Sequence, residues 1–285
     1  EGEAFGFLGP NGAGKSTTIR HLMGFSKADE GELSINGKDS WKSAANIKQD
    51  VGYLPGELAF PKGMTGDQFI EFMANERQIT DMTRTEQLKE LFKVETSKEI
   101  KEMSLGTKRK LAVVTAFMHN PKILILDEPT SGLDPVMQER FIQFILKEKS
   151  EGKTILLSSH IFTEVDATCD RIAIIKDGVV VSTVESNELK QSTNKSFKIE
   201  FASFEDYQKF IENTEFTIPT KRPEQNQVKL SLTDQKMQEF FTELSEVKVN
   251  FISEIKFTLE DYFMDFYDRK KTVAAGEENL RYGLH

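Results

Sequence analysis

The chain has 285 residues, of which 38% are hydrophobic and 10% aromatic, and this is enough for one large or two ordinary globular domains. A mean hydropathy of -0.43, with no apolar run near the roughly 20 residues that a bilayer requires, excludes a transmembrane span. A net charge of -9 and a pI near 5.2 argue against non-specific nucleic-acid binding, which needs a basic surface. Without a signal-peptide pattern, we expect a cytosolic protein with no nucleic-acid partner.

The first predicted element is a short buried strand, Ala4 to Leu8, and because the chain opens on it we expect further strands upstream. A turn and a helix start follow, and they match the pattern GxxxxGK[ST]. Glycines let backbone amides surround phosphate oxygens, and the helix offers its positive end. Lys15 adds a charge at the β- and γ-phosphates, and Ser16 offers a hydroxyl to Mg²⁺. The candidate phosphate-binding residues are Gly9, Pro10, Asn11, Gly12, Ala13, Gly14, Lys15, Ser16 and Thr17.

Two short strands come next, Leu33 to Asn36 and Val51 to Pro55, and a helical segment of about residues 60–119 follows them. Thr65 is expected to cap the first helix of this segment. Thr83 is expected to cap the second, because Thr83-x-x-Glu86 has the spacing of a capping box.

A third helix is predicted to start near Ser104 and to end at Asn120-Pro121. Lys108, Arg109 and Lys110 crowd its first turns, where the helix dipole disfavours cations. Either these three side chains are simply solvated, or an anion lies nearby.

The run Ile123 to Leu126 is typical of a central strand buried on both faces, and Asp127 and Glu128 follow it directly. A carboxylate at the end of such a strand can hold Mg²⁺ beside a phosphate-binding loop, and a second one can polarise water. On its own, this acidic pair is an ordinary boundary between a strand and a loop. Combined with the pattern at residues 9–16, it indicates a Mg-nucleotide hydrolase.

Asp134 is predicted to cap another helix, and a buried strand over Thr154 to Ser158 ends close to His160. This alternation predicts a doubly wound parallel sheet, with a hairpin at Asp177-Gly178. Cys169, the single cysteine, fits a buried apolar position better than a nucleophile.

From Ser196 the order becomes strand, helix, two strands around Pro223, helix, strand and a final helix over 259–267, which resembles a small ferredoxin-like α+β unit. Residues 196–268 carry 8 Lys and Arg against 15 Asp and Glu, so most of the net negative charge lies here. We therefore expect a main domain over 1–190, an accessory domain over 196–270 and a tail over 271–285.

In their order and spacing, these motifs resemble the nucleotide-binding subunit of an ATP-binding-cassette (ABC) transporter, from the first residue to about Glu185. Residues 9–17 resemble Walker A, 123–128 Walker B with its catalytic glutamate, and 131–134 the D-loop. His160 sits where the switch histidine is found, and residues 103–107 occupy the signature position. The resemblance implies a P-loop NTPase with a RecA-like parallel sheet and a helical subdomain.

The resemblance also implies a mechanism. Two copies form a homodimer head to tail around two ATP molecules, so that each ATP lies on one Walker A loop and is covered by Ser104 and Gly106 of the other copy. Asp134, at the end of the D-loop, is a further candidate nucleotide-binding residue. Glu128 activates the attacking water, and His160 bonds the γ-phosphate. Ser16 and Asp127 hold Mg²⁺.

Two departures from the family pattern stand out. Gly56-Glu57 replaces the glutamine expected after the second short strand, and Leu105 replaces a signature glycine. The resemblance implies a motor at the inner face of the cell membrane that exports a drug, antibiotic or peptide through a separate integral-membrane permease. The alternatives are a soluble cassette protein acting on ribosomes or DNA, and an ABC-type ATPase with a regulatory role.

Overall fold

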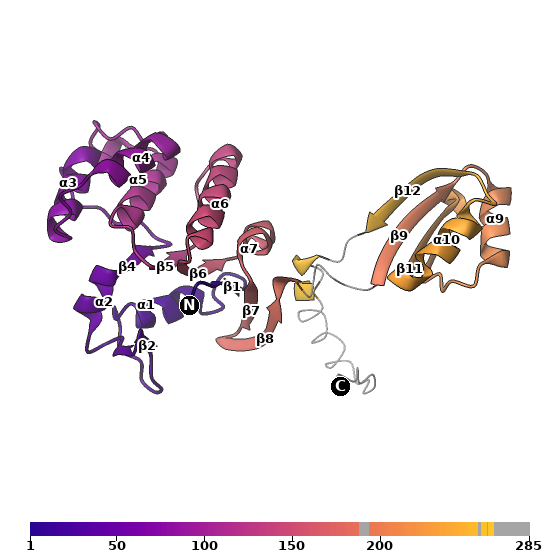
Figure 1. Cartoon of the computed structure of the whole chain (residues 1–285), viewed down its shortest axis with the longest axis horizontal. Helices are drawn as coiled ribbons and strands as arrows, with labels where there is room; N and C mark the ends of the chain where they lie inside the picture. The colour runs from indigo at the N-terminus through magenta and orange to yellow at the C-terminus, as the bar shows by residue number, and fades with distance from the viewer. Residues whose placement is uncertain (188–193, 256–257, 261, 265–285) are drawn as a thin grey trace. The chain divides into compact units, whose positions relative to one another are not determined.

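The computed structural model describes residues 1–187, 194–255, 258–260 and 262–264 (Figure 1). The chain divides into two compact units, Glu1–Ser186 and Asn187–His285, and each is described here by itself. The predicted tail lies outside the described residues, and so does part of the predicted final helix. In the part of the chain that is described, no helix is both long and apolar enough to cross a membrane.

The first unit is built on a six-stranded sheet with the strand order β4-β5-β6-β1-β7-β8. Neighbouring strands from β4 to β7 are parallel, and only β8 runs antiparallel to its neighbour. The hairpin before β8 turns at Asp177 and Gly178, which have φ of 51° and 79°, as predicted. The strands are β1 (Ala4–Leu8), β4 (Val51–Leu54), β5 (Ile123–Asp127), β6 (Thr154–Ser159), β7 (Arg171–Lys176) and β8 (Val179–Glu185).

Helices cover both faces of this sheet, which explains why its central strands are continuously apolar. On one face lie α1 (Lys15–Leu22) and α2 (Ala44–Asp50), whose Ile19 and Ile47 pack with Ile125 of β5. On the other face lie α5, α6 and α7 (Figure 1). Their bounds are α5 (Leu105–Phe117), α6 (Pro135–Ser150) and α7 (Phe162–Thr168). The predicted doubly wound parallel sheet is therefore confirmed.

The helical segment contains α3 (Gly66–Glu76), α4 (Thr83–Phe92) and a short 3-10 turn, η1 (Ile100–Glu102), before α5, and its helices lie together in Figure 1. Thr65 caps α3 in a capping box with Gln68, as predicted. The prediction for Thr83 is wrong, because Met82 is the N-cap of α4 and Asp81 Oδ1 accepts the Thr83 amide at 2.9 Å. The aspartate two residues earlier has taken the capping role.

In the second unit, two helices pack on one face of an antiparallel sheet of order β10-β11-β9-β12. This order is that of the predicted ferredoxin-like arrangement. Its core is apolar and includes Ile199, Phe201, Leu230 and Phe240. The elements are β9 (Asn194–Phe201), α9 (Phe204–Asn213), β10 (Thr220–Arg222), η2 (Pro223–Gln225), β11 (Gln227–Thr233), η3 (Asp234–Lys236), α10 (Met237–Leu244) and β12 (Val249–Ile255).

A small hairpin completes the first unit, with β2 (Ser34–Ile35) paired to β3 (Lys38–Asp39). Cys169 follows α7 and is 4% exposed, and burial raises the pKa of its thiol to about 12. A thiol with such a pKa is a poor nucleophile, as the sequence predicted.

Candidate functional site

The turn between β1 and α1 depends on its glycines. Gly14 is the N-cap of α1 with φ of 106°, and Gly12 has φ of 83°, both in the left-handed region that favours glycine. At Gly9 a Cβ atom would lie 2.5 Å from the carbonyl oxygen of Ile175, so no side chain fits there. The sequence therefore fixes a tight loop at the positive end of α1, where an anion is favoured.

Lys15, the first residue of α1, is only 5% exposed. Its Nζ donates to the carbonyl oxygens of Gly9 at 2.7 Å and Pro10 at 3.2 Å. The same Nζ lies 3.3 Å from Oε1 of Glu128, an ion pair whose geometry is not that of a hydrogen bond. The loop and the acidic strand end thus share one buried ammonium group, which keeps its charge paired.

Glu128 occupies the turn directly after β5, with φ of 48°. Its amide donates to the carbonyl of Ser158 at 2.9 Å, which fixes the turn against β6. Its Oε2 lies 2.6 Å from Nδ1 of His160, on the loop after β6. The carboxylate therefore bridges Lys15 and His160. A non-glycine residue at positive φ stores backbone strain, and such residues cluster at functional sites.

Asp127, the last residue of β5, is 3% exposed. Its Oδ1 accepts a hydrogen bond from the hydroxyl of Ser158. A Cβ atom at Gly56 would lie 3.0 Å from Oδ2, so the glycine keeps space open beside that oxygen. Asp127 and the hydroxyl of Ser16 on α1 are both hard oxygen donors, the kind that Mg²⁺ prefers. The donor set on β5 and α1 therefore fits the metal.

Glu57, which stands near the expected glutamine, does not take over that role. Its side chain is 95% exposed, and its ion pair is a loose one with Arg20 at 3.9 Å. Gly56 lies beside Asp127 but has no side chain, and the side chain of Glu57 points into solvent. Neither residue therefore brings a side chain to the Asp127 carboxylate.

The predicted signature and D-loop residues lie at two helix starts. Ser104 caps α5 by accepting from the amide of Thr107 at 3.1 Å, and Asp134 caps α6 by accepting from the amide of Met137 at 3.0 Å. A Cβ atom at Gly106 would lie 3.1 Å from the carbonyl oxygen of the D-loop residue Gly132. The described part of the chain shows no hydrogen bond or ion pair from Ser104, Gly106 or Asp134 to residues 9–17. Among the described residues of one copy, these candidates are therefore not bonded to the phosphate-binding loop.

Sequence reasoning missed the burial of two charged residues near this site. Glu164 on α7 is 2% exposed and accepts from the hydroxyl of Ser159 at 2.7 Å. Burial, with a smaller contribution from Glu128, raises the pKa of Glu164 to about 7. No signal in the sequence distinguishes it from a surface acid. Arg109 is 3% exposed and bonded to backbone carbonyls, so the interpretation that it is solvated is wrong. The carboxylates of Asp127 and Glu128 are the nearby anions, because both act to raise the pKa of Arg109 against the lowering by burial.

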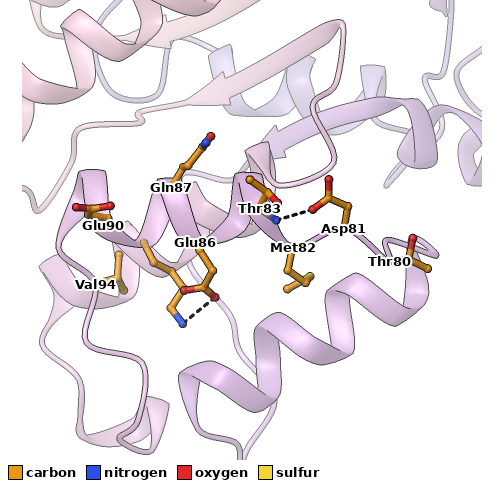
Figure 2. A pocket seen from close by; sticks show the side chains of 9 residues that line it. Thr80, Asp81, Met82, Thr83, Glu86, Gln87, Glu90 and Val94 are labelled. Carbon is orange, nitrogen blue, oxygen red and sulfur yellow. Dashed lines mark hydrogen bonds and ion pairs between the residues drawn. The ribbon is translucent and has the colours of Figure 1, made fainter.

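A hollow of 850 Å³ lies elsewhere, lined by residues of α4 and of the segments on either side of it (Figure 2). Its wall carries three carboxylates, Asp81, Glu86 and Glu90, against one cation, Lys89, and this excess of negative charge disfavours a phosphate. None of the predicted site residues lines it, so it is separate from the strand-end site.

The sheet topology and the loop before α1, with a buried lysine and a strand-end aspartate, define a P-loop NTPase. A family model described as ABC transporter matches residues 1–131. The linearmycin resistance ATP-binding protein LnrL of Bacillus subtilis (strain 168) is 34% identical over 194 residues, which are 66% of this chain and 62% of LnrL. The bacitracin transport ATP-binding protein BcrA of Bacillus licheniformis is 33% identical, with 71% of this chain and 67% of BcrA covered.

Among solved structures, one described as the ATP binding subunit of an ABC transporter aligns with a TM-score of 0.62 at 29% identity. The alignment covers 67% of this chain and 81% of that one. The match to LnrL spans less than two thirds of that relative's length. The chain belongs to the ABC transporter ATP-binding proteins, a family of ATPases.

Proposed function

We propose that this protein is the ATP-hydrolysing motor subunit of an exporter that moves a drug, antibiotic or peptide through a separate permease. The observation that carries the proposal is the position of Glu128, whose carboxylate lies between Lys15 and His160 and directly after the buried Asp127. Such a carboxylate can accept a proton from water beside a phosphate-binding loop.

In this proposal, the amides of residues 9–14 and the Nζ of Lys15 bind the β- and γ-phosphates of ATP. Lys15 exchanges the Gly9 and Pro10 carbonyls for phosphate oxygens, which are stronger partners for an ammonium group. Glu128 orients the attacking water and accepts its proton, while His160 holds the Glu128 carboxylate and bonds the γ-phosphate. Catalysis then consists of positioning and charge neutralisation.

We assign Ser16 and Asp127 to a Mg²⁺ ion. When bound, Mg²⁺ neutralises phosphate charge and fixes the orientation of the β- and γ-phosphates. The Asp127 carboxylate is held for this role by Ser158, which occupies one of its oxygens and leaves the other facing the space beside Gly56.

A homodimer in head-to-tail orientation completes the site. Ser104 and Gly106 make no bond to the phosphate-binding loop of their own copy, yet they lie at the exposed, positive start of α5, which suits the γ-phosphate on a second copy. The D-loop residue Asp134 lies in the same interface.

Export is supported by two relatives, one a linearmycin resistance protein and the other a bacitracin transport protein. We place the chain in the cytoplasm, on the inner face of the cell membrane and bound to an integral-membrane permease. We also propose that residues 1–190 form the ATPase domain, with residues 60–119 as its helical subdomain, and that residues 196–270 form an accessory domain.

The test has two parts. The purified protein should hydrolyse ATP when Mg²⁺ is present, and the Lys15→Ala variant should not. Tagged protein extracted from membranes in detergent should carry a protein with several membrane spans at a fixed ratio, and the same ratio should persist for Lys15→Ala. An ATPase recovered only from the soluble fraction, with no such partner, would favour the regulatory alternative.

A further inference from the structure

Arg109 lies on α5 just after the signature residues, and its guanidinium is buried, with 3% of the residue exposed. Each of its three nitrogens donates to a backbone carbonyl. Nη1 donates to Pro55 at 2.7 Å, Nη2 to Gly56 at 2.6 Å, and Nε to Ser131 at 3.0 Å. The guanidinium thus binds three carbonyl oxygens at once.

These carbonyls belong to two loops that flank the acidic strand end. The loop at Pro55 and Gly56 follows β4 and faces the Asp127 carboxylate across the space beside Gly56. The turn at Ser131 follows Glu128, and the amide of Ser131 donates to the carbonyl of Glu128 at 3.1 Å. Arg109 therefore ties α5 to the loops on both sides of the predicted metal ligand and base.

Burying the Arg109 guanidinium costs free energy, and packing alone does not require a charged group at this position. Burial lowers the pKa of Arg109, with Asp127 and Glu128 acting in the opposite direction. Burying an ion is unfavourable unless hydrogen bonds satisfy it, and an apolar residue of similar volume would avoid that cost. The planar fork of arginine meets several acceptors in fixed directions, which a lysine ammonium cannot do.

We propose that Arg109 is a positioning residue that couples the start of α5, with Ser104 and Gly106, to the loops that hold Asp127 and Glu128. A shift of the α5 start is transmitted through the guanidinium to Gly56 and Ser131, and through Ser131 to Glu128. The proposal rests on the proposed function, in which a phosphate on a second copy binds at the start of α5. Binding of that phosphate then sets the geometry of Glu128 within the same chain.

The neighbouring lysines supply matched controls. Lys108 and Lys110 flank Arg109 on the same helix and are half-buried. Neither side chain forms a hydrogen bond or an ion pair with the described residues, so replacing either removes a cation from this helix without touching the two loops.

The experiment compares Arg109→Lys and Arg109→Met with Lys108→Met, measuring the kcat and KM of ATP hydrolysis together with amide hydrogen exchange. Both Arg109 variants should speed exchange at residues 56–57 and 131–133. Their kcat should fall between about tenfold and about hundredfold, because a small displacement of a catalytic group has effects of that size. Their KM should change less than about threefold, since residues 9–17 are untouched, and Lys108→Met should match the unmodified protein.

Arg109→Lys keeps the charge and covers the case in which Arg109→Met fails to fold. Faster exchange with an unchanged kcat would overturn the coupling and leave Arg109 as a structural clamp. Unchanged exchange in both variants would overturn it as well. If the unmodified protein hydrolyses no ATP, the proposed function is wrong, and the coupling is then tested by amide exchange in the two loops with and without Mg-ATP. Mg-ATP should change the exchange rates of these loops in the unmodified protein and in Lys108→Met. It should leave them unchanged in the two Arg109 variants.

Discussion

The two units of the chain differ in where they bury charge. In the described part of Glu1–Ser186, buried charged side chains occur in the core and at the strand ends, and these are Lys15, Arg109, Asp127, Glu148, Lys153 and Glu164. In the described part of the second unit, Gln227 is the only buried polar residue, and the remaining buried residues are apolar. Each buried ion costs free energy unless it is bonded. The described part of the first unit therefore buries charged groups that could take part in chemistry, whereas the described core of the second unit buries none.

Burial of charge alone does not mark a catalytic group. Glu148 on α6 is ion-paired to Lys153 and, at 2.6 Å, to Arg84 of α4. It therefore links two helices, and neither of these partners belongs to the phosphate-binding loop. Asp127 differs because it is the last residue of β5, and Lys15 differs because it begins α1 after the loop that follows β1. Ligands bind at the carboxyl ends of the strands in open α/β sheets. Position in the fold separates the two kinds of buried charge.

The largest effect should come from removing the ammonium group of the loop. Lys15→Ala leaves Glu128 without its partner and a bound triphosphate without its cation, and losing one member of a buried pair costs about 3–5 kcal/mol. ATP affinity should fall by more than about a hundredfold, measured by equilibrium titration. Lys108→Ala serves as the control for lost charge. An affinity within threefold of the unmodified protein would contradict this role.

A core truncation in the second unit should have an equally large effect, in this case on the free energy of unfolding of that unit. Phe240 is fully buried against Phe197 and Phe216, and Phe→Ala in a core costs about 3–5 kcal/mol of unfolding free energy. The second unit of Phe240→Ala should unfold first in denaturant, while ATP affinity should stay unchanged. Loss of ATP binding in a variant whose first unit is still folded would show that the units are not separable.

The buried acid on α7 should make stability depend on pH. The pKa of Glu164 is raised from 4.5 to about 7, so between these values the unfolded chain releases a proton that the folded chain keeps. Stability therefore falls as pH rises through this window. Glu164→Gln removes this pH-dependent loss of stability, because glutamine does not ionise, and its amide oxygen can still accept from the hydroxyl of Ser159. The substitution should therefore stabilise the protein by up to about 3 kcal/mol at pH 8 and have little effect at pH 4.5. Equal effects at both pH values would refute the assignment.

A smaller effect is expected for His160→Ala, since His160 is half exposed and contacts Glu128 without contacting the phosphate-binding loop. ATP affinity should be kept, and turnover should fall between about tenfold and about hundredfold, which corresponds to about 1.4–2.7 kcal/mol. A parallel loss of affinity would instead indicate a structural histidine.

The sequence predicts the parts of the site whose signal is local. These parts are the glycines and lysine of residues 9–17, the strand that ends at Asp127, the helix start near Ser104 and the cap at Asp134. In each of them, the residues that form the pattern lie within a few positions of one another. The doubly wound sheet and the ferredoxin-like order follow from the same local periodicities. These parts were therefore predictable without the fold.

Contacts with backbone atoms distant in sequence were not predictable. The carbonyls that bind Arg109 lie 22, 53 and 54 positions away, and they carry no side-chain pattern. The dipole conflict at the start of α5 was the only sign, and it suggested solvation or an anion. The Thr83 prediction failed for a local reason. Asp81 accepts the Thr83 amide that a capping box assigns to Glu86, and the pattern gave no way to rank these two carboxylates.

The central claim is that Glu128 accepts the proton and Lys15 binds the nucleotide. Glu128→Gln tests it most directly, because the amide keeps the shape of the side chain and cannot act as a base. We predict an ATP affinity equal to that of the unmodified protein and a turnover lower by about 100-fold to 10,000-fold, measured on one preparation with Mg²⁺ present. A Glu128→Gln protein that hydrolyses ATP at the rate of the unmodified protein would contradict the claim.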